Sequence, residues 1–183
     1  GKSAVSTDGI NWTQGSGPSS NGSYKQVAYD GTTYITPSYR YGRIYKSTDG
    51  LTWTSQTVAD RNWSGVAYGN GTWVITGALK GSGGTGIILY STDGGSTWTE
   101  TDAPNESYWR KVAFGNGIFV SYANYAYDGS TNWIMYSTDG ITWTASNVTD
   151  HVAWQAIDYV DGKFIILGPS GEHRGLVSDD GIN

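Results

Sequence analysis

The sequence is poor in the residues that staple small proteins or anchor membrane proteins. Its 183 residues include no cysteine, one methionine and four prolines, and only 15% of them are charged. Without cysteine no disulfide can form, and no apolar run approaches the ~20 residues of a membrane-spanning helix, so we expect no membrane partner. The chain is nevertheless 14% aromatic. That content excludes a disordered chain, because disordered segments are poor in aromatics and rich in charge.

Basic residues and metal ligands are also scarce. The formal net charge is −5, and the 11 lysines and arginines are scattered singly, which predicts no nucleic-acid partner. His151 and His173 stand 22 residues apart without a ligand cluster, whereas zinc sites use three or four ligands. The glycine-rich stretch 81–86 is followed by no Lys-Ser pair, which indicates a loop and not a phosphate cradle. The sequence therefore predicts neither a metal nor a cofactor.

Glycine is abundant, with 27 residues, and one phrase containing it recurs five times. The phrase is Ser-x-Asp-Gly, followed in four copies by a tryptophan. Its aspartates, separated by 41, 44, 46 and 41 residues, are Asp8, Asp49, Asp93, Asp139 and Asp180, and the tryptophans are Trp12, Trp53, Trp98 and Trp143. Glycine supplies a positive φ cheaply, and Ser and Asp side chains accept hydrogen bonds from turn amides. Each copy therefore predicts a tight turn with a structural carboxylate and a tryptophan packed between neighbouring repeats.

A second phrase recurs at nearly the same period. Each copy has an aromatic residue three positions before a Val or Ile and ends in Asn-Gly, Asp-Gly or a close variant; these aromatics are Tyr24, Trp63, Trp109 and Trp154. Asn-Gly and Asp-Gly pairs supply the positive φ angles of hairpin turns. A β-rich run follows each turn, as at 73–76 and 118–121.

One repeat therefore consists of four short strands, A to D, expected at 66–68, 72–76, 87–91 and 97–100. Four strands in ~40–50 residues, repeated radially, predict an all-β β-propeller of four-stranded antiparallel blades. The chain enters at a C strand (2–6) and contains four A, four B, five C and four D strands, or about four blades. We expect a single propeller domain or propeller fragment over 1–183, with repeats at about 1–23, 24–62, 63–108, 109–150 and 151–183.

The first phrase resembles the Asp-box, or bacterial neuraminidase repeat, whose pattern is Ser-x-Asp-x-Gly-x-Thr-Trp. Residues 91–98 match it at every position, and the other complete copies are one residue shorter. The resemblance implies a propeller, but not one function, since the box occurs in sialidases, other glycosidases, photosystem assembly factors, sorting receptors and phage adhesins. Near-identical copies joined by Gly-Asn-Gly turns look most like repeats of phage-tail or secreted bacterial proteins. This favours a secreted or virion-associated location.

One C strand is surplus to a closed ring of four blades. A terminal strand could replace its twin in a four-bladed ring, the chain could be part of a longer array, or two chains could join head to tail as eight blades. Open blades would expose sheet edges and apolar faces. We therefore expect a homo-oligomer that closes the ring.

The Asp-box carboxylates are poor candidates for catalysis. A glycosidase needs two carboxylates that converge ~5–10 Å apart about one bond, and five copies spread around a rim do not converge. By family resemblance a sialidase would also have an arginine triad, a Tyr–Glu pair and an Arg-Ile-Pro motif, but Arg43-Ile44-Tyr45 lacks the proline. We therefore expect no enzymatic activity.

The aromatics before each A strand are the best binding candidates. If exposed, Tyr24, Trp63, Trp109 and Trp154 would form a ring that stacks on sugars; the alternative is packing between blades. The function expected is a non-catalytic recognition or structural module, with a multivalent carbohydrate-binding adhesin as its more specific form. A protein-binding scaffold is the alternative, and a glycosidase-class enzyme comes third.

Overall fold

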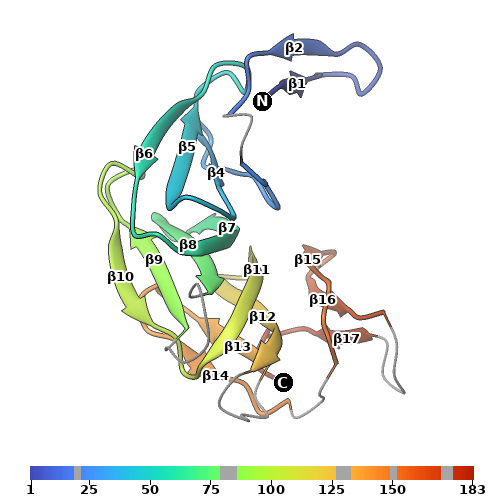
Figure 1. The fold of residues 1–183 in the computed structure, drawn as a ribbon. Helices are drawn as coiled ribbons and strands as arrows, with labels where there is room; N and C mark the ends of the chain where they lie inside the picture. The colour runs from blue at the N-terminus through green and yellow to red at the C-terminus, as the bar shows by residue number, and fades with distance from the viewer. Residues whose placement is uncertain (19–21, 79–85, 127–132, 149–151, 170–174) are drawn as a thin grey trace.

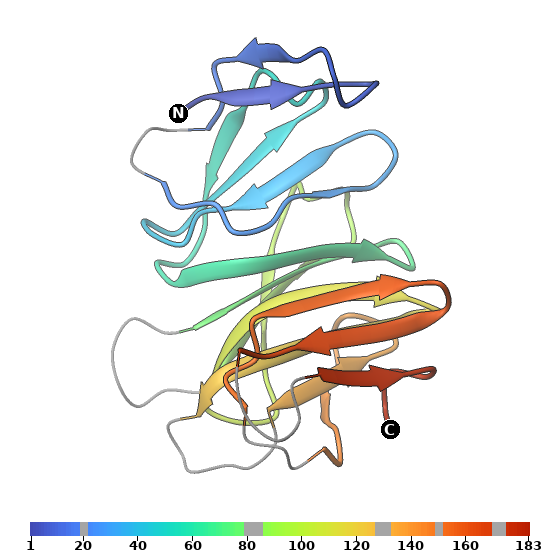
Figure 2. The ribbon, with the colours of Figure 1, turned by 90° about the vertical axis from the view of Figure 1, so that its right-hand side faces the viewer.

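The computed structural model describes residues 1–18, 22–78, 86–126, 133–148, 152–169 and 175–183. These residues form 17 strands in five antiparallel sheets. They include no helix, and so none long and apolar enough to cross a membrane. The sheets follow one another along an open arc whose two ends stay apart (Figure 1). A view from the side shows the hairpin and blades I to III following one another from top to bottom, with the C-terminal sheet in front of blade III (Figure 2).

Three sheets are complete blades of four strands. Blade I contains β3 (Ala28–Tyr29), β4 (Tyr34–Pro37), β5 (Arg43–Ser47) and β6 (Thr54–Thr57). Blade II contains β7 (Asn62–Gly69), β8 (Thr72–Ala78), β9 (Ile87–Ser91) and β10 (Thr99–Asp102). Blade III contains β11 (Ser107–Gly115), β12 (Ile118–Ala126), β13 (Ile134–Ser137) and β14 (Thr144–Ala145).

The two remaining sheets lie at the ends of the arc. The N-terminal hairpin pairs β1 (Ser3–Val5) with β2 (Thr13–Gly15), and the C-terminal sheet consists of β15 (Ala156–Val160), β16 (Lys163–Leu167) and β17 (Gly175–Ser178). The strands therefore number four A, four B, five C and four D, as the repeats predict. The all-β propeller fold with four-stranded antiparallel blades is confirmed.

Individual strands differ from the prediction where the sheet is irregular. β7 and β11 begin at Asn62 and Ser107, several residues before the expected A strands. Their pairing with the next strand shifts register near Trp63 and near Trp109, as in a β-bulge. The bulges keep both tryptophans within the strands and not in the preceding loops. The D strand expected at 97–100 forms at Thr99–Asp102.

The A–B connections are two-residue hairpin turns in three of the four repeats. Asn70 (φ 50°) and Gly71 (φ 77°) form one of them, and the equivalent pairs are Asn116-Gly117 and Asp161-Gly162. Two consecutive positive φ angles match the right-handed twist of the flanking strands. The turn after β3 is longer, since Tyr29 pairs with Tyr34, and there the carboxylate of Asp30 accepts hydrogen bonds from the amides of Thr32 and Thr33.

Neighbouring blades approach closely where the A strands end. A Cβ atom on Gly69 would lie 2.2 Å from the ring of Phe114 in the next blade, and one on Gly115 would lie 2.0 Å from the ring of Tyr159. Glycine thus lets an aromatic ring lie directly on the backbone of the preceding blade. The equivalent position in the C-terminal sheet is Val160, which is exposed.

We predict that Gly69→Ala destabilises the protein by ~1–3 kcal/mol, because the added methyl group must displace the ring of Phe114. Gly175→Ala is the matched control: its Cβ would meet the flexible end of Leu167 at 3.1 Å, and its stability should change little. Thermal unfolding followed by circular dichroism measures both variants. Equal stability of the two would contradict the close-packing argument.

Candidate functional site

The Ser-x-Asp-Gly turns share one hydrogen-bonded structure. In blade I, Asp49 Oδ1 accepts bonds from the amides of Leu51 and Thr52, both at 2.8 Å. Ser47 Oγ donates to the same carboxylate at 2.9 Å and accepts from the amide of Gly50 at 2.8 Å. The other four turns are also built around their Ser–Asp pairs. These carboxylates are therefore used inside the turns, as the sequence predicts.

The turns also keep their carboxylates ionised. Amide bonds from Thr52 and Leu51, with the Ser47 hydroxyl, lower the pKa of Asp49 to about 2. Hydrogen bonds led by those from Asn11, Thr97 and Asn183 hold the pKa of Asp8, Asp93 and Asp180, respectively, well below the usual range. Burial opposes the shift in Asp139, but the amides of Thr142 and Ile141 still lower its pKa.

The tryptophan after each turn differs in burial along the chain. Trp143 is only 8% exposed and belongs to a core cluster shared by blades II and III, while Trp98 packs partly buried against a cluster that includes Ile35 and Ile44. Trp53 is also partly buried. Trp12 is 61% exposed, so the prediction that every such tryptophan fills a gap between repeats is wrong for the N-terminal hairpin. The hairpin has no sheet before it against which Trp12 could pack (Figure 1).

The expected ring of exposed aromatics is not present. Trp63 and Trp109 are completely buried and Trp154 is 1% exposed, so none of these rings can stack on a sugar in this arrangement. Trp63 Nε1 donates to the carbonyl of Ala59 at 2.9 Å. Tyr24 is partly buried edge-on to Tyr45, 5.5 Å away, and burial raises its pKa. The structure corrects the exposed-ring prediction in favour of its packing alternative, because the bulged strands turn these side chains into the interior.

A cluster of cations and phenol rings, which the sequence analysis missed, joins blade I to blade III. It consists of Lys25, Tyr39, Tyr108, Arg110 and Asn124, and we call it the Arg110 cluster. The guanidinium carbon of Arg110 lies 5.8 Å from the ring centre of Tyr39 and 5.6 Å from that of Tyr108, and Nε donates to Asn124 Oδ1 at 2.8 Å. The ammonium group of Lys25 lies 5.9 Å from the ring centre of Tyr39. The side chain of Arg110 is thus held by rings and an amide oxygen, none of them an anion, among the described residues.

Backbone irregularity positions the cluster. Arg110 stands at the register shift of β11, and its carbonyl accepts bonds from Ser64 Oγ at 2.7 Å and Thr76 Oγ1 at 3.2 Å in blade II. Beside it, Gln26 donates to the carbonyl of Val112 at 2.9 Å and accepts from the amide of Val66 at 3.2 Å. Three blades are therefore fixed to one another at this point. β11, which carries Tyr108 and Arg110, lies on the inner side of the arc together with β7 (Figure 1).

Charge is unevenly distributed between the two edges of the blades. The edge with the Ser-x-Asp-Gly turns contains the five ionised turn carboxylates described above. The opposite edge, where A strands begin and C strands begin, contains seven described cations: Lys2, Lys25, Arg40, Arg43, Arg61, Arg110 and Lys111. Its described acids are fewer: Asp60, Asp102 and Glu106. The chain is acidic overall, but the edge that bears the Arg110 cluster favours anions.

The remaining predicted features yield no site. His151, His173 and most of the 81–86 stretch lie outside the described residues. Within the described part of the chain, no three His, Cys, Asp or Glu side chains gather closely enough to hold a metal ion.

Comparison with known proteins shows the fold. No family model and no curated protein matches the sequence. Among solved structures, the chain is similar to YCF48 bound to D1 peptide (TM-score 0.63, 18% identity), over 87% of this chain and 51% of that one. A catalytically inactive virginiamycin B lyase from Staphylococcus aureus has a TM-score of 0.68 at 18% identity, over 95% and 61%. A chain of a nidogen–laminin complex gives 0.68 at 13% identity, over 91% and 63%.

These are β-propeller proteins, and the chain spans between half and two thirds of their length. Identities of 13–18% establish a common fold and leave activity and partners to be argued from the site.

We predict that the protein loses stability as the pH falls from about 4 toward 2. The folded pKa of Asp49 is about 2, whereas an unfolded aspartate titrates near 3.9. Because folding lowers the pKa, the stabilising contribution is complete above the unfolded value and disappears as pH falls through the folded one. Melting temperatures measured between pH 2 and 7 test this.

Asp49→Asn should lower the melting temperature at pH 7 by a few degrees and weaken its acid dependence. Asp102→Asn, an exposed aspartate on β10 outside the turns, removes the same charge and serves as the control. A similar loss in both variants would show that net charge, and not the turn, is responsible.

Proposed function

We propose that the chain is a non-catalytic recognition module that binds an acidic peptide or protein segment through the Arg110 cluster. The observation that carries this proposal is a guanidinium group fixed between two phenol rings and an amide oxygen, with no described anion among these contacts. An arginine held in this way is ready for a carboxylate, because its planar fork is already oriented.

The surroundings of Arg110 favour a protein ligand. Tyr39 and Tyr108 supply flat, amphipathic contact area, and Tyr and Arg are the residues that dominate protein-binding hot spots. Burial raises the pKa of Tyr122 to about 12, against the opposing charge of Arg110, so this nearby phenol stays neutral at physiological pH. Lys25 adds a second cation within reach of the same ring. An extended segment with spaced carboxylates matches this pattern of charge and aromatic surface.

Carbohydrate binding has weaker support. It rested on exposed Trp63, Trp109 and Trp154, and all three are buried. Without them, the described surface offers no repeated aromatic platform once per blade. The peptide-binding experiment described below therefore includes a glycan array as a comparison.

The absence of catalysis is part of the proposal. Every Ser-x-Asp-Gly carboxylate is engaged by hydrogen bonds within its own turn, and no described carboxylate contacts Arg110. The similar structures include a lyase as well as a propeller bound to a peptide and one in complex with laminin, so the fold itself is compatible with either class.

We predict that Arg110→Gln weakens binding of a short fluorescent Glu-rich peptide by at least ~10-fold, measured by fluorescence anisotropy at low salt. Lys163→Gln, which removes the same charge from a lysine paired with Asp179 in the C-terminal sheet, should leave binding unchanged. Equal weakening by both variants would indicate attraction by net charge alone. Binding to a glycan array but not to the peptide would instead support the carbohydrate hypothesis.

A further inference from the structure

Large exposed apolar side chains of the described residues gather at the two ends of the arc. Seven of the eight belong to the N-terminal hairpin, to β3 and the segment before it, or to the C-terminal sheet: Ile10, Trp12, Val27, Tyr29, Val160, Leu167 and Val177. The eighth, Tyr41, lies between β4 and β5 of blade I. Solitary exposed apolar residues are ordinary, but gathered patches mark interaction surfaces.

One blade interface shows how a turn tryptophan is normally accommodated. Trp143 lies in a core cluster between blades II and III, whose members include Val74, Ile88, Ala103, Phe119 and Met135. A Cβ atom on Gly140 of the same turn would lie 2.7 Å from Val74 and 3.2 Å from Phe119. Blade II supplies one wall of this site and blade III supplies the other.

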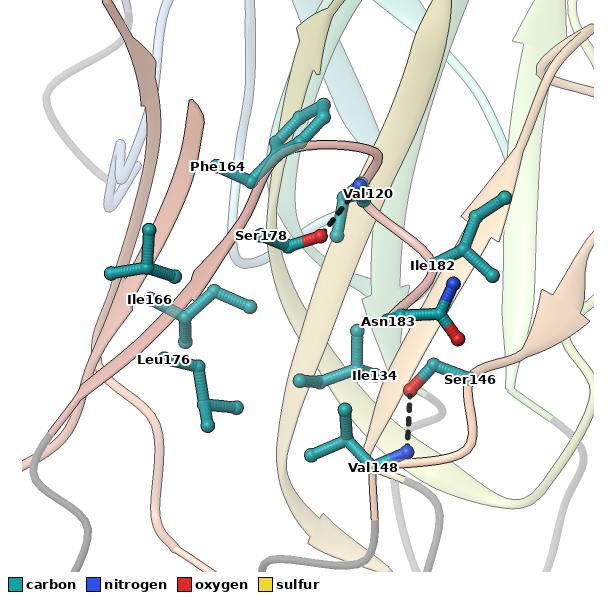
Figure 3. Close-up of a pocket in the computed structure, with 12 residues that line it drawn as sticks. Val120, Ile134, Ser146, Val148, Phe164, Ile166, Leu176, Ser178, Ile182 and Asn183 are labelled. Carbon is teal, nitrogen blue, oxygen red and sulfur yellow. Dashed lines mark hydrogen bonds between the residues drawn. The ribbon is translucent and has the colours of Figure 1, made fainter. Parts of the chain in front are cut away.

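The same walls recur one blade later without a tryptophan between them. The repeat equivalents of the five residues around Trp143 are Val120, Ile134, Val148, Phe164 and Leu176, and all five line an apolar pocket between blade III and the C-terminal sheet (Figure 3). The equivalence follows from the register, since Val74 pairs with Tyr90 on β9 and Val120 pairs with Tyr136 on β13. The turn of the C-terminal sheet is also in place, with Gly181 against Val120 and Phe164.

The two ends therefore complement each other. The N-terminal hairpin has a turn tryptophan without a site, and the C-terminal sheet has a tryptophan site without a tryptophan. Their turns share the sequence Ser-x-Asp-Gly-Ile-Asn, at 6–11 and 178–183, which no other turn of the chain has. A hairpin brought to the C-terminal sheet would thus carry a turn of the same form.

We propose that two copies of this chain join head to tail, with Trp12 of each copy seated in the apolar pocket of the other. In this exchange the hairpin of one copy takes the place of β17 in the other: by the shared turn sequence, Ala4 of β1 replaces Leu176 and Gly9 replaces Gly181, while Val120, Ile134, Val148 and Phe164 remain as the walls around Trp12. β2 then adds the fourth strand of the blade. β15 and β16 in turn fill the groove of about 590 Å³ beside β1, whose lining includes Val5, Val27, Tyr34 and Trp53. Because the exchange is reciprocal, it covers the apolar surface at both ends of each copy.

Two copies fit the size of the arc. Each copy supplies three complete blades and one shared blade, and its ends remain apart in the single chain (Figure 1). The chain also aligns with only 51–63% of the length of the propeller chains compared above.

The mass of the 183-residue protein in solution, from size exclusion with light scattering, tests the proposal. We expect twice the chain mass of 19.7 kDa for the unchanged protein. Trp12→Ala should raise the dissociation constant of the dimer on the order of 100-fold and should therefore run as a single copy. Trp12 is exposed, so its removal leaves the fold intact. Tyr41→Ala, the exposed aromatic away from the ends, is the control and should stay dimeric.

A mixing experiment separates head-to-tail exchange from general destabilisation. Val148→Asp places a charge in the pocket and should also give single copies. An equimolar mixture with Trp12→Ala should restore two-copy particles, because the intact Trp12 of one variant meets the intact pocket of the other. A wild-type protein that is a single copy at all concentrations, a dimer that survives Trp12→Ala, or folded variants that fail to pair on mixing would overturn the proposal.

Discussion

A four-stranded sheet with two apolar faces cannot bury both of them alone, and this constraint governs the whole molecule. Blades II and III are each covered by the sheet before and the sheet after. Buried tryptophan side chains fill the space between adjacent sheets, together with the aromatic rings that lie over Gly69 and Gly115. The stability of one repeat therefore comes largely from its interfaces with the neighbouring repeats, as in other repeat architectures.

The hydrogen-bonded turns serve this packing by fixing its geometry. A turn that binds its own carboxylate needs nothing from its neighbours, but its backbone carbonyls remain available to them. Lys46 of blade I donates to the carbonyls of Gly94 and Gly95 in blade II, and Asn70 of blade II donates to those of Gly117 and Thr138 in blade III. The turns therefore act as rigid contact points by which one blade sets the position of the next.

Local patterns made the fold predictable from the sequence. The strand order, the count of strands and the Asn70-Gly71 type of turn depend on residues close together in the chain, and the structure confirms them. The burial of Trp63 and Trp109 was not predictable in the same way, because it depends on bulges that shift the register of β7 and β11. The Arg110 cluster depends on a contact with Tyr39, 71 residues away, and no periodic signal marks it. Repetition indicated the scaffold, while the candidate site comes from residues that depart from the repeat.

Val160 makes the C-terminal end of the array different from the other repeats, although their sequences are similar. Where Gly69 and Gly115 accept the ring of the following blade against bare backbone, Val160 presents a branched side chain. A blade that follows the C-terminal sheet therefore cannot copy the contact between blades II and III. Tyr29, which would occupy that ring position at the start of blade I, is exposed and stacks on Tyr34 at 4.3 Å. The near-identical modules are consequently not interchangeable, because duplicating or circularly permuting them would place unlike surfaces together.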